Sequence, residues 1–377
     1  MSRSGLGLSS RTLKCAAPFR FRLRIRLQNK GKLQTVNNAT NSCGVYIIAE
    51  MSANHLGSKE RALEIIHAAH DAGADAVKFQ HYTSETITVR SDHPDFRVSG
   101  GTLWDGRQLA DLYAEAMTPW EWTGDLVAEA NKLGIDWLSS PFDNSAVDFL
   151  EQFNIATYKI ASFELVDLPL IRYVASKGKP MIMSTGMSTL DEIDAAVTAA
   201  QGAGAPSVSI LRCNSAYPAS VDEMDLNAIP VLINRYKCRV GLSDHTVGSV
   251  ASIGAVALGA TIIEKHITLD RNDGGPDGAF STEPVEFRKL VDDVREAYLS
   301  LGEVRFGPSP SEQKSLFFRR SLRAVSAIRA GDVISESNVR SVRPAGGLPP
   351  DDFARIVGKK ATRDIAVGEP ITNELLG

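Results

Sequence analysis

Two histidines occupy similar positions in the chain, each at the end of an apolar run. His245 closes the run in "GLSDHTVG" (241–248), and His266 closes the run in "IIEKHITLD" (262–270). If both runs are neighbouring buried strands, the two imidazoles can meet at one metal ion. Such a pair leaves coordination positions for water or a substrate oxygen, which is typical of catalytic metal sites. Two satisfied core histidines are the competing interpretation.

Polar side chains end nearly all the other apolar runs between residues 45 and 268. They are Glu50, Lys78, Gln80, Ser140, Lys159, Ser162, Glu164, Ser184, Ser215, Tyr217, Ser243 and Glu264. Any one of them alone is best interpreted as a solvated loop residue, but the recurrence favours one shared site. Lysines supply point charges and serines supply adaptable donors, so the set suits a small molecule with phosphate and carboxylate groups. A Schiff-base lysine is the competing role.

The elements that must position these residues are eight short apolar runs separated by amphipathic helical stretches. The runs are 45–50, 76–80, 137–141, 157–162, 180–185, 208–213, 239–245 and 261–268. Strands that are apolar throughout and alternate with helices predict a parallel sheet covered by helices. Eight such units predict a TIM (β/α)8 barrel, with an open doubly wound sheet as the alternative. Because a TIM barrel forms its active site at the carboxyl ends of its strands, the polar residues share one destination.

Changes in composition and pattern along the chain predict four segments. Residues 1–43 are a basic N-terminal extension. Three interpretations of it are possible: a transit peptide, a disordered leader or a mis-assigned start. Residues 44–302 are the barrel, whose last helix is predicted over 284–302. Residues 303–315 are a linker rich in Pro and Ser, and residues 316–377 have the short strands and glycine turns of a small β-rich domain.

Charge and composition narrow the classes of function. Residues 1–43 hold nine Arg or Lys and no acid, so the remainder carries a net charge of −13 (32 − 45). An acidic body argues against nucleic-acid binding, and no apolar run reaches the ~20 residues that a membrane span needs. The four cysteines, Cys15, Cys43, Cys213 and Cys238, lack metal-type spacing. We therefore expect a cytoplasmic protein with reduced thiols.

The chain resembles the sialic acid synthases, which condense phosphoenolpyruvate with an amino sugar. The motifs that carry the resemblance are "IIAEMSANH" (47–55), "GADAVKFQ" (73–80), "TPWEW" (118–122), "SSPFD" (139–143), "YKIASFE" (158–164), "STGM" (184–187), "GLSDHT" (241–246), "EKHITLDR" (264–271) and "GGPDGAFS" (274–281). The resemblance covers residues 44–377, and "RRSLRA" and "VRPAGG" look like marks of the family's C-terminal antifreeze-like SAF domain. "SANH" and "TPWEW" resemble the pseudaminate branch.

The resemblance implies a role for individual residues. It implies that His245 and His266 bind a divalent metal, most often Mn2+, with Mg2+ or Co2+ as alternatives. The phosphoenolpyruvate contacts would be Lys78, Lys159, Ser162, Ser184 and Ser243. Glu50 would stand beside the condensation centre, and the sugar or its aldehyde would be handled by Gln80, Glu164, Tyr217 and Asp277. Arg343 would reach into the barrel of the partner in a domain-swapped homodimer.

One residue departs from the family's pattern. In "CNSAYP" this chain has Ser215 where the neuraminate enzymes have Asn, two residues before the tyrosine. A hydroxyl there is consistent with a different branch. The sugar of the pseudaminate branch is 2,4-diacetamido-2,4,6-trideoxy-L-altrose. N-acetylneuraminate and legionaminate synthases are the alternatives within the family. A metal-dependent aldolase or hydrolase and a non-catalytic carbohydrate-binding protein are the alternatives outside it.

Overall fold

The structure, a computed structural model, describes residues 44–377, and the predicted basic extension of residues 1–43 lies outside this range. Its first part is a closed barrel of parallel strands in sequential order, β1 to β8. The strands are Tyr46–Glu50, Ala76–His81, Asp136–Pro141, Tyr158–Ile160, Met181–Ser184, Val208–Cys213, Val240–Asp244 and Ile262–His266. Each falls on a predicted run. The predicted TIM barrel is therefore confirmed, and the open sheet was the wrong alternative.

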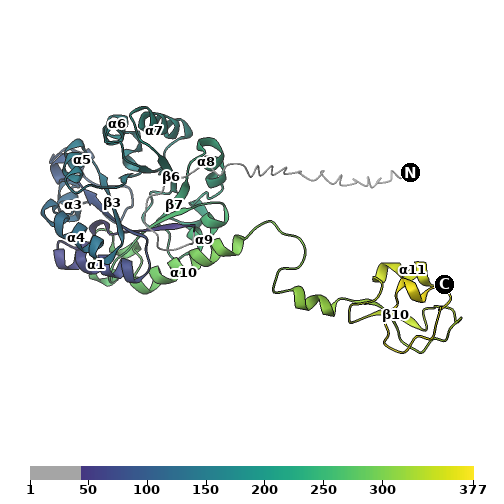
Figure 1. The fold of residues 1–377 in the computed structure, drawn as a ribbon. Helices are drawn as coiled ribbons and strands as arrows, with labels where there is room; N and C mark the ends of the chain where they lie inside the picture. The colour runs from purple at the N-terminus through teal and green to yellow at the C-terminus, as the bar shows by residue number, and fades with distance from the viewer. Residues whose placement is uncertain (1–43) are drawn as a thin grey trace, which may run out of the picture. The chain divides into compact units, whose positions relative to one another are not determined.

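Helices form a ring around the strands (Figure 1). Around the barrel these are α1 Lys59–Asp71, α2 Ser84–Ile87, α3 Leu109–Ala116, α4 Thr123–Leu133, α5 Asn144–Glu151, α6 Leu168–Ser176, α7 Leu190–Gly202, α8 Ala228–Tyr236, α9 Val250–Ala257 and α10 Pro284–Leu301. Several begin at side-chain caps: Ser58 accepts from the Arg61 N–H, and Thr189 forms a capping box with Glu192. Such caps satisfy backbone donors that have no partner inside the helix.

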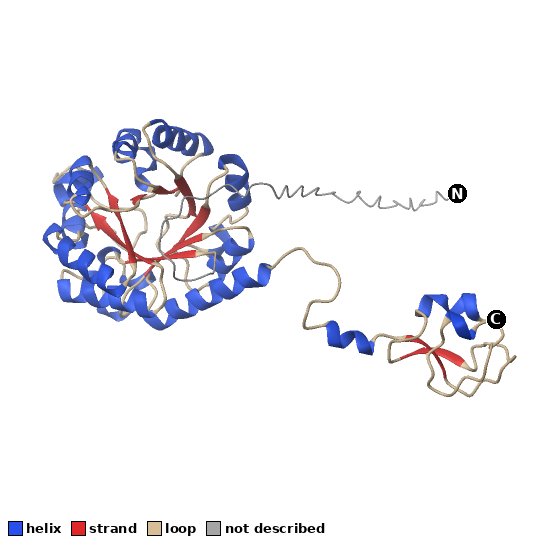
Figure 2. Ribbon diagram, viewed as in Figure 1, coloured by secondary structure: helices blue, strands red, loops and turns tan. Residues whose placement is uncertain are grey.

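Alternation along each strand separates two packing layers. Ile48, Leu138, Leu211 and Ile262 belong to a small apolar cluster inside the barrel, whereas neighbours such as Ile47 and Ile263 pack in the large cluster with the helices. Figure 2 shows the strands enclosed by the helices. Side chains alternate between the two faces of a strand, so the polar residues that lie two or four positions after the inner cluster also face inward.

A two-stranded antiparallel sheet organises the C-terminal part. It pairs β9 Ser321–Ala324 with β10 Val339–Val342, and the short helix α11, Phe353–Ile356, contributes Ile356 to a separate apolar core. In the loop after β10, the Pro344 carbonyl accepts from Ser321 Oγ at 2.7 Å and from Arg323 Nε at 2.9 Å. The "RRSLRA" motif thus fixes the backbone that carries Arg343. Among residues 44–377 no helix is both long and apolar enough to cross a membrane.

Candidate active site at the carboxyl ends of the strands

Two buried lysines and two buried carboxylates form the charged centre of the barrel mouth. Lys78 Nζ lies 2.8 Å from Glu50 Oε2 and 3.2 Å from Glu264 Oε1, and Lys159 Nζ lies 3.4 Å from the same Glu264 oxygen. Burial disfavours an ionised Glu264, but the charges of Lys159 and Lys78 outweigh it and lower its pKa to about 2. Burial also lowers the pKa of Lys78, to about 8. Both lysines thus contact buried carboxylates, and an anionic substrate could replace part of these contacts.

Glu50 is held by a second set of contacts. Gln80 Nε2 donates to Glu50 Oε1 at 2.8 Å and to Ser52 Oγ at 3.0 Å. Strand register explains the meeting, because Glu50 pairs with Lys78 on one side and with His266 on the other. Glu50 therefore stands between the lysines and the histidines.

The two imidazoles lie side by side, as their positions in the sequence predict. The ring centroids of His245 and His266 are 5.4 Å apart. His245 Nδ1 lies 2.7 Å from the Asn214 carbonyl, and because a carbonyl only accepts, Nδ1 carries the proton. Burial lowers the pKa of His245, but the Cys213 thiol and the Asn214 carbonyl raise it above the ordinary value. Burial and the neighbouring His245 hold the pKa of His266 well below its ordinary value.

This donor pair suits an open metal site. His266 is neutral, and its buried Nδ1 has no hydrogen-bond partner among residues 44–377. His245 keeps Nε2 free because Nδ1 donates to a carbonyl, an arrangement that commonly orients metal-ligating histidines. The described residues hold no cluster of three or more His, Cys, Asp or Glu side chains that could bind a metal. The remaining ligands would therefore have to be water or substrate oxygens.

Several hydroxyl groups also lie at or just beyond the carboxyl ends of the strands. Ser162 Oγ and Ser215 Oγ are 2.8 Å apart, so Ser215, the departure from the neuraminate pattern, contacts a predicted phosphoenolpyruvate residue. Ser243 Oγ donates to Glu264 Oε1 at 3.2 Å, and Ser140 Oγ lies 3.5 Å from Lys78 Nζ. Ser184 Oγ is buried and has no partner within the described part of the chain. These hydroxyls are available to oxygens of an anionic ligand.

Gly186 is required by this serine pair. Its φ is +50°, and a Cβ there would come 2.6 Å from Ser162 Cβ and 2.9 Å from Ser215 Oγ. We expect Gly186→Ala to separate the two serines and to lower kcat/KM for the anionic substrate by ~10-fold, the worth of one good hydrogen bond. Gly178→Ala is the matched control, because Gly178 has φ +68° with nothing within 4 Å of its Cβ position. Equal steady-state kinetics of the two variants would contradict a role for the serine pair.

Glu164 has a perturbed carboxyl group. Its Oε2 is buried without a hydrogen-bond partner among the described residues, and burial raises its pKa from 4.5 to about 7, opposed in part by Lys159. Since the folded-state pKa exceeds the unfolded one, ionisation destabilises the fold as pH rises from about 4.5 to about 7.

Glu164→Gln should therefore raise the melting temperature at pH 8 and have little effect at pH 4.5. A gain of about 2 °C or more is expected at pH 8 for a stabilisation of ~1 kcal/mol. Thermal melts across this pH range measure it. A difference that does not change with pH would show that Glu164 is not buried as an acid.

Aromatic side chains surround the imidazoles, and two of them, Trp104 and Phe280, were not predicted as site residues. The ring of Tyr217 lies 4.3 Å from that of His245, and Phe280 lies 5.1 Å from His266 and 5.0 Å from Tyr217, between centroids. Trp104, from the long loop after β2, lies 5.8 Å from Tyr217 and donates from Nε1 to the Pro276 carbonyl at 2.8 Å. Phe280 lies in the quoted motif "GGPDGAFS", which could have pointed to it, whereas no motif or strand-end position marks Trp104.

Two predicted residues remain, Asp277 in the loop after β8 and Arg343 in the loop after β10. Asp277 Oδ2 accepts from the Ala53 N–H at 3.3 Å, and burial raises the pKa of Asp277 above its ordinary value. Arg343 belongs to the C-terminal domain, where it is exposed and forms no ion pair with residues 44–377.

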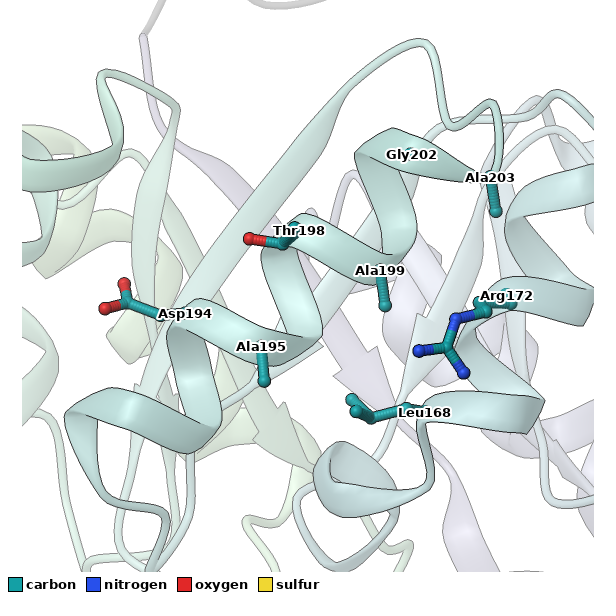
Figure 3. A pocket seen from close by; sticks show the side chains of 8 residues that line it. All are labelled: Leu168, Arg172, Asp194, Ala195, Thr198, Ala199, Gly202 and Ala203. Atoms are coloured by element: carbon teal, nitrogen blue, oxygen red, sulfur yellow. The ribbon is translucent and has the colours of Figure 1, made fainter.

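A cavity of about 570 Å³ lies elsewhere, between α6 and α7 in the outer layer. In Figure 3 Leu168 and Arg172 extend toward the small side chain of Ala199, while the Asp194 carboxylate points away. Asp194 is already bound by Arg235 and by the Tyr236 hydroxyl. This cavity lacks convergent polar groups, so we place the chemistry at the barrel mouth.

Two family models together match most of the described chain. Residues 65–306 match the NeuB family and residues 319–376 match the SAF domain. Pseudaminic acid synthase of Campylobacter jejuni (strain 81-176) is 43% identical, over 89% of this chain and 98% of that protein. N,N'-diacetyllegionaminic acid synthase of Campylobacter jejuni is 37% identical, over 86% and 98%. The crystal structure of N-acetylneuraminic acid synthetase from Leptospira borgpetersenii has a TM-score of 0.64 at 33% identity, over 72% and 90%.

Proposed function

Because the chain belongs to the NeuB family and carries a C-terminal SAF domain, we propose that it condenses phosphoenolpyruvate with an amino sugar. The sugar that we propose is 2,4-diacetamido-2,4,6-trideoxy-L-altrose, and the products are pseudaminic acid and phosphate. The observation that carries the proposal is the meeting of two buried lysines, Lys78 and Lys159, with the imidazoles of His245 and His266 at one end of the barrel.

Phosphoenolpyruvate suits the cationic half of this site. Lys78 and Lys159 would each exchange part of their contact with Glu264 or Glu50 for a phosphate or carboxylate oxygen. Charge-assisted hydrogen bonds of this kind are among the strongest that a protein makes. The hydroxyls of Ser162, Ser184 and Ser243 would complete the anion's shell.

The reaction balances with water as the only further reactant. C3 of phosphoenolpyruvate bonds to the aldehyde carbon of the open-chain sugar, and the aldehyde oxygen gains a proton. A water oxygen bonds to C2, and its two protons go to the former aldehyde oxygen and to the departing phosphate. The C2=O double bond of the product forms as the bond between C2 and the phosphate oxygen breaks. Glu50 would take the water's proton or stabilise positive charge at C2, and we favour water activation because contacts with Gln80 and Lys78 hold its carboxyl group in place.

His245 and His266 would hold a divalent ion, for which we propose Mn2+, with Mg2+ or Co2+ as substitutes. When bound, such an ion polarises a carbonyl oxygen and stabilises its developing charge, by several kcal/mol in typical metal enzymes. The neutral His266 and the free Nε2 of His245 support this assignment.

The sugar would lie under the aromatic residues of the mouth. Tyr217, Phe280 and Trp104 offer apolar surface to a 6-deoxy sugar. Gln80, Glu164 and Asp277 offer polar atoms for acetamido and hydroxyl groups.

A homodimer would complete the site. Apolar side chains stay exposed on the loops that follow β4 to β7, including Phe163 (56%), Met187 (63%) and Val247 (73%), and an apolar rim favours a cover. We propose that the partner's SAF domain covers it and supplies Arg343. Mixing and exchanging the inactive variants Arg343→Ala and His266→Gln should then restore activity, because the Arg343→Ala barrel receives an intact arginine. Failure to restore activity after subunit exchange would contradict the swap.

The substrate is tested with purified protein, Mn2+, phosphoenolpyruvate and one sugar at a time. We expect fast phosphate release and a product of pseudaminate mass with the altro sugar. Faster turnover of its manno isomer, or of N-acetylmannosamine, would assign the chain to legionaminate or N-acetylneuraminate synthesis instead. Phosphate release without any sugar, or none with all three, would contradict the condensation itself.

The free thiols of Cys213 and Cys238 support the cytoplasm as the compartment that we propose.

A further inference from the structure

A second buried ion pair lies behind the histidines, on the outer face of the barrel strands. Lys265 Nζ is 3.1 Å from Asp244 Oδ2, and the two side chains are 2% and 0% exposed. Asp244 and Lys265 are register partners on β7 and β8. Each directly precedes one histidine in the chain, so alternation points the pair toward the helices while His245 and His266 point into the mouth.

This pair also holds the residue on the other side of His245. Asp244 Oδ1 accepts from the Thr246 N–H at 2.9 Å and from Thr246 Oγ1 at 2.7 Å, and Lys265 Nζ donates to the Thr246 carbonyl at 2.6 Å. Ser252 Oγ, on α9, donates to Asp244 Oδ2 at 2.6 Å. Asp244 therefore holds the amide and hydroxyl of Thr246, and Lys265 holds its carbonyl.

Stability alone does not account for this arrangement. The surrounding outer layer is apolar, and replacing a buried ion pair by apolar residues of similar volume is often neutral or stabilising. The pair does tie the backbone on both sides of His245 to the residue before His266. We propose that Asp244, Lys265 and Thr246 form a positioning clamp that sets the spacing of the two imidazoles for a divalent ion.

This proposal rests on the proposed metal site, so its test measures the affinity for Mn2+ directly. The full-length protein is titrated with Mn2+, and the electron paramagnetic resonance signal measures the Mn2+ that stays free. The double variant Asp244→Leu/Lys265→Met removes both charges together. We expect it to keep a melting temperature near that of the wild type while Mn2+ affinity falls about 10–100-fold, as is typical when the partners of metal ligands are changed. Thr246→Val, a milder isosteric change, should weaken Mn2+ binding in the same direction.

Asp75→Asn is the matched control. Asp75 pairs with Arg295 at 3.2 Å and accepts from the Ile47 N–H at 2.8 Å, at the opposite, amino-terminal end of β2. It should lower the melting temperature without changing Mn2+ affinity. Wild-type affinity in both the double variant and Thr246→Val would overturn the clamp and leave the proposed function standing. A wild-type protein that binds no Mn2+ would overturn the proposed metal, and the clamp with it.

Discussion

Replacing His266 by glutamine is expected to lower turnover by ~10³-fold, because several kcal/mol of charge stabilisation on the aldehyde oxygen would be lost. His266 is buried beside His245, with ring centroids 5.4 Å apart, and its Nδ1 has no partner within residues 44–377. The measurement is phosphate release that depends on both substrates, with Mn2+ in excess.

His67→Gln is the matched control for this variant. His67 lies on the surface and contacts Glu129 at 2.9 Å, so its replacement should leave turnover unchanged. If His266→Gln kept more than about a tenth of wild-type turnover, the imidazole pair would not be the centre of the chemistry.

Replacing Lys159 by methionine is expected to lower kcat/KM for phosphoenolpyruvate by ~10²–10³-fold, because truncating one partner of a buried charged contact typically costs 2–5 kcal/mol. The Lys159 side chain is only 2% exposed, and its ammonium reaches Glu264 at 3.4 Å. Methionine keeps the length and the apolar stem and removes the charge. The effect should appear mainly in the KM for phosphoenolpyruvate, with a smaller change for the sugar.

Lys179→Met provides the comparison. Lys179 pairs with Glu151 at 2.8 Å but is 20% exposed, and surface pairs contribute ~0–1 kcal/mol. It should match the wild type in kcat/KM. A Lys159→Met enzyme with an unchanged KM for phosphoenolpyruvate would place the anion elsewhere.

The barrel could be predicted because its signal is local. Runs such as 45–50 and 180–185 carry apolar residues on both faces, which is typical of strands buried between an inner core and a layer of helices. Once eight such runs were recognised, strand ends such as Lys78 and His266 had to meet, since parallel strands carry their carboxyl ends to one side.

The contacts inside the site were not predictable in this way. Glu264 was one strand-end residue among many, and only the closed barrel reveals that it contacts both lysines and Ser243. Trp104 comes from a loop whose course no periodicity specifies. The Asp244–Lys265 pair could not be predicted, because the sequence does not show which residue lies across a neighbouring strand.

Residue 215 illustrates what resemblance adds and what structure adds. The family pattern marks Ser215 as a departure from the neuraminate enzymes, but it gives no reason for a hydroxyl. The structure places Ser215 Oγ 2.8 Å from Ser162 Oγ and next to Gly186. A longer amide there would have to displace this pair.

Removal and restoration of the divalent ion tests the central claim most directly. Protein stripped with a chelator should release no phosphate from phosphoenolpyruvate and the altro sugar, and added Mn2+ should restore the rate in proportion to sites filled. Stripped protein that works at the full rate would contradict the account, because the reaction would then proceed without a divalent ion at His245 and His266.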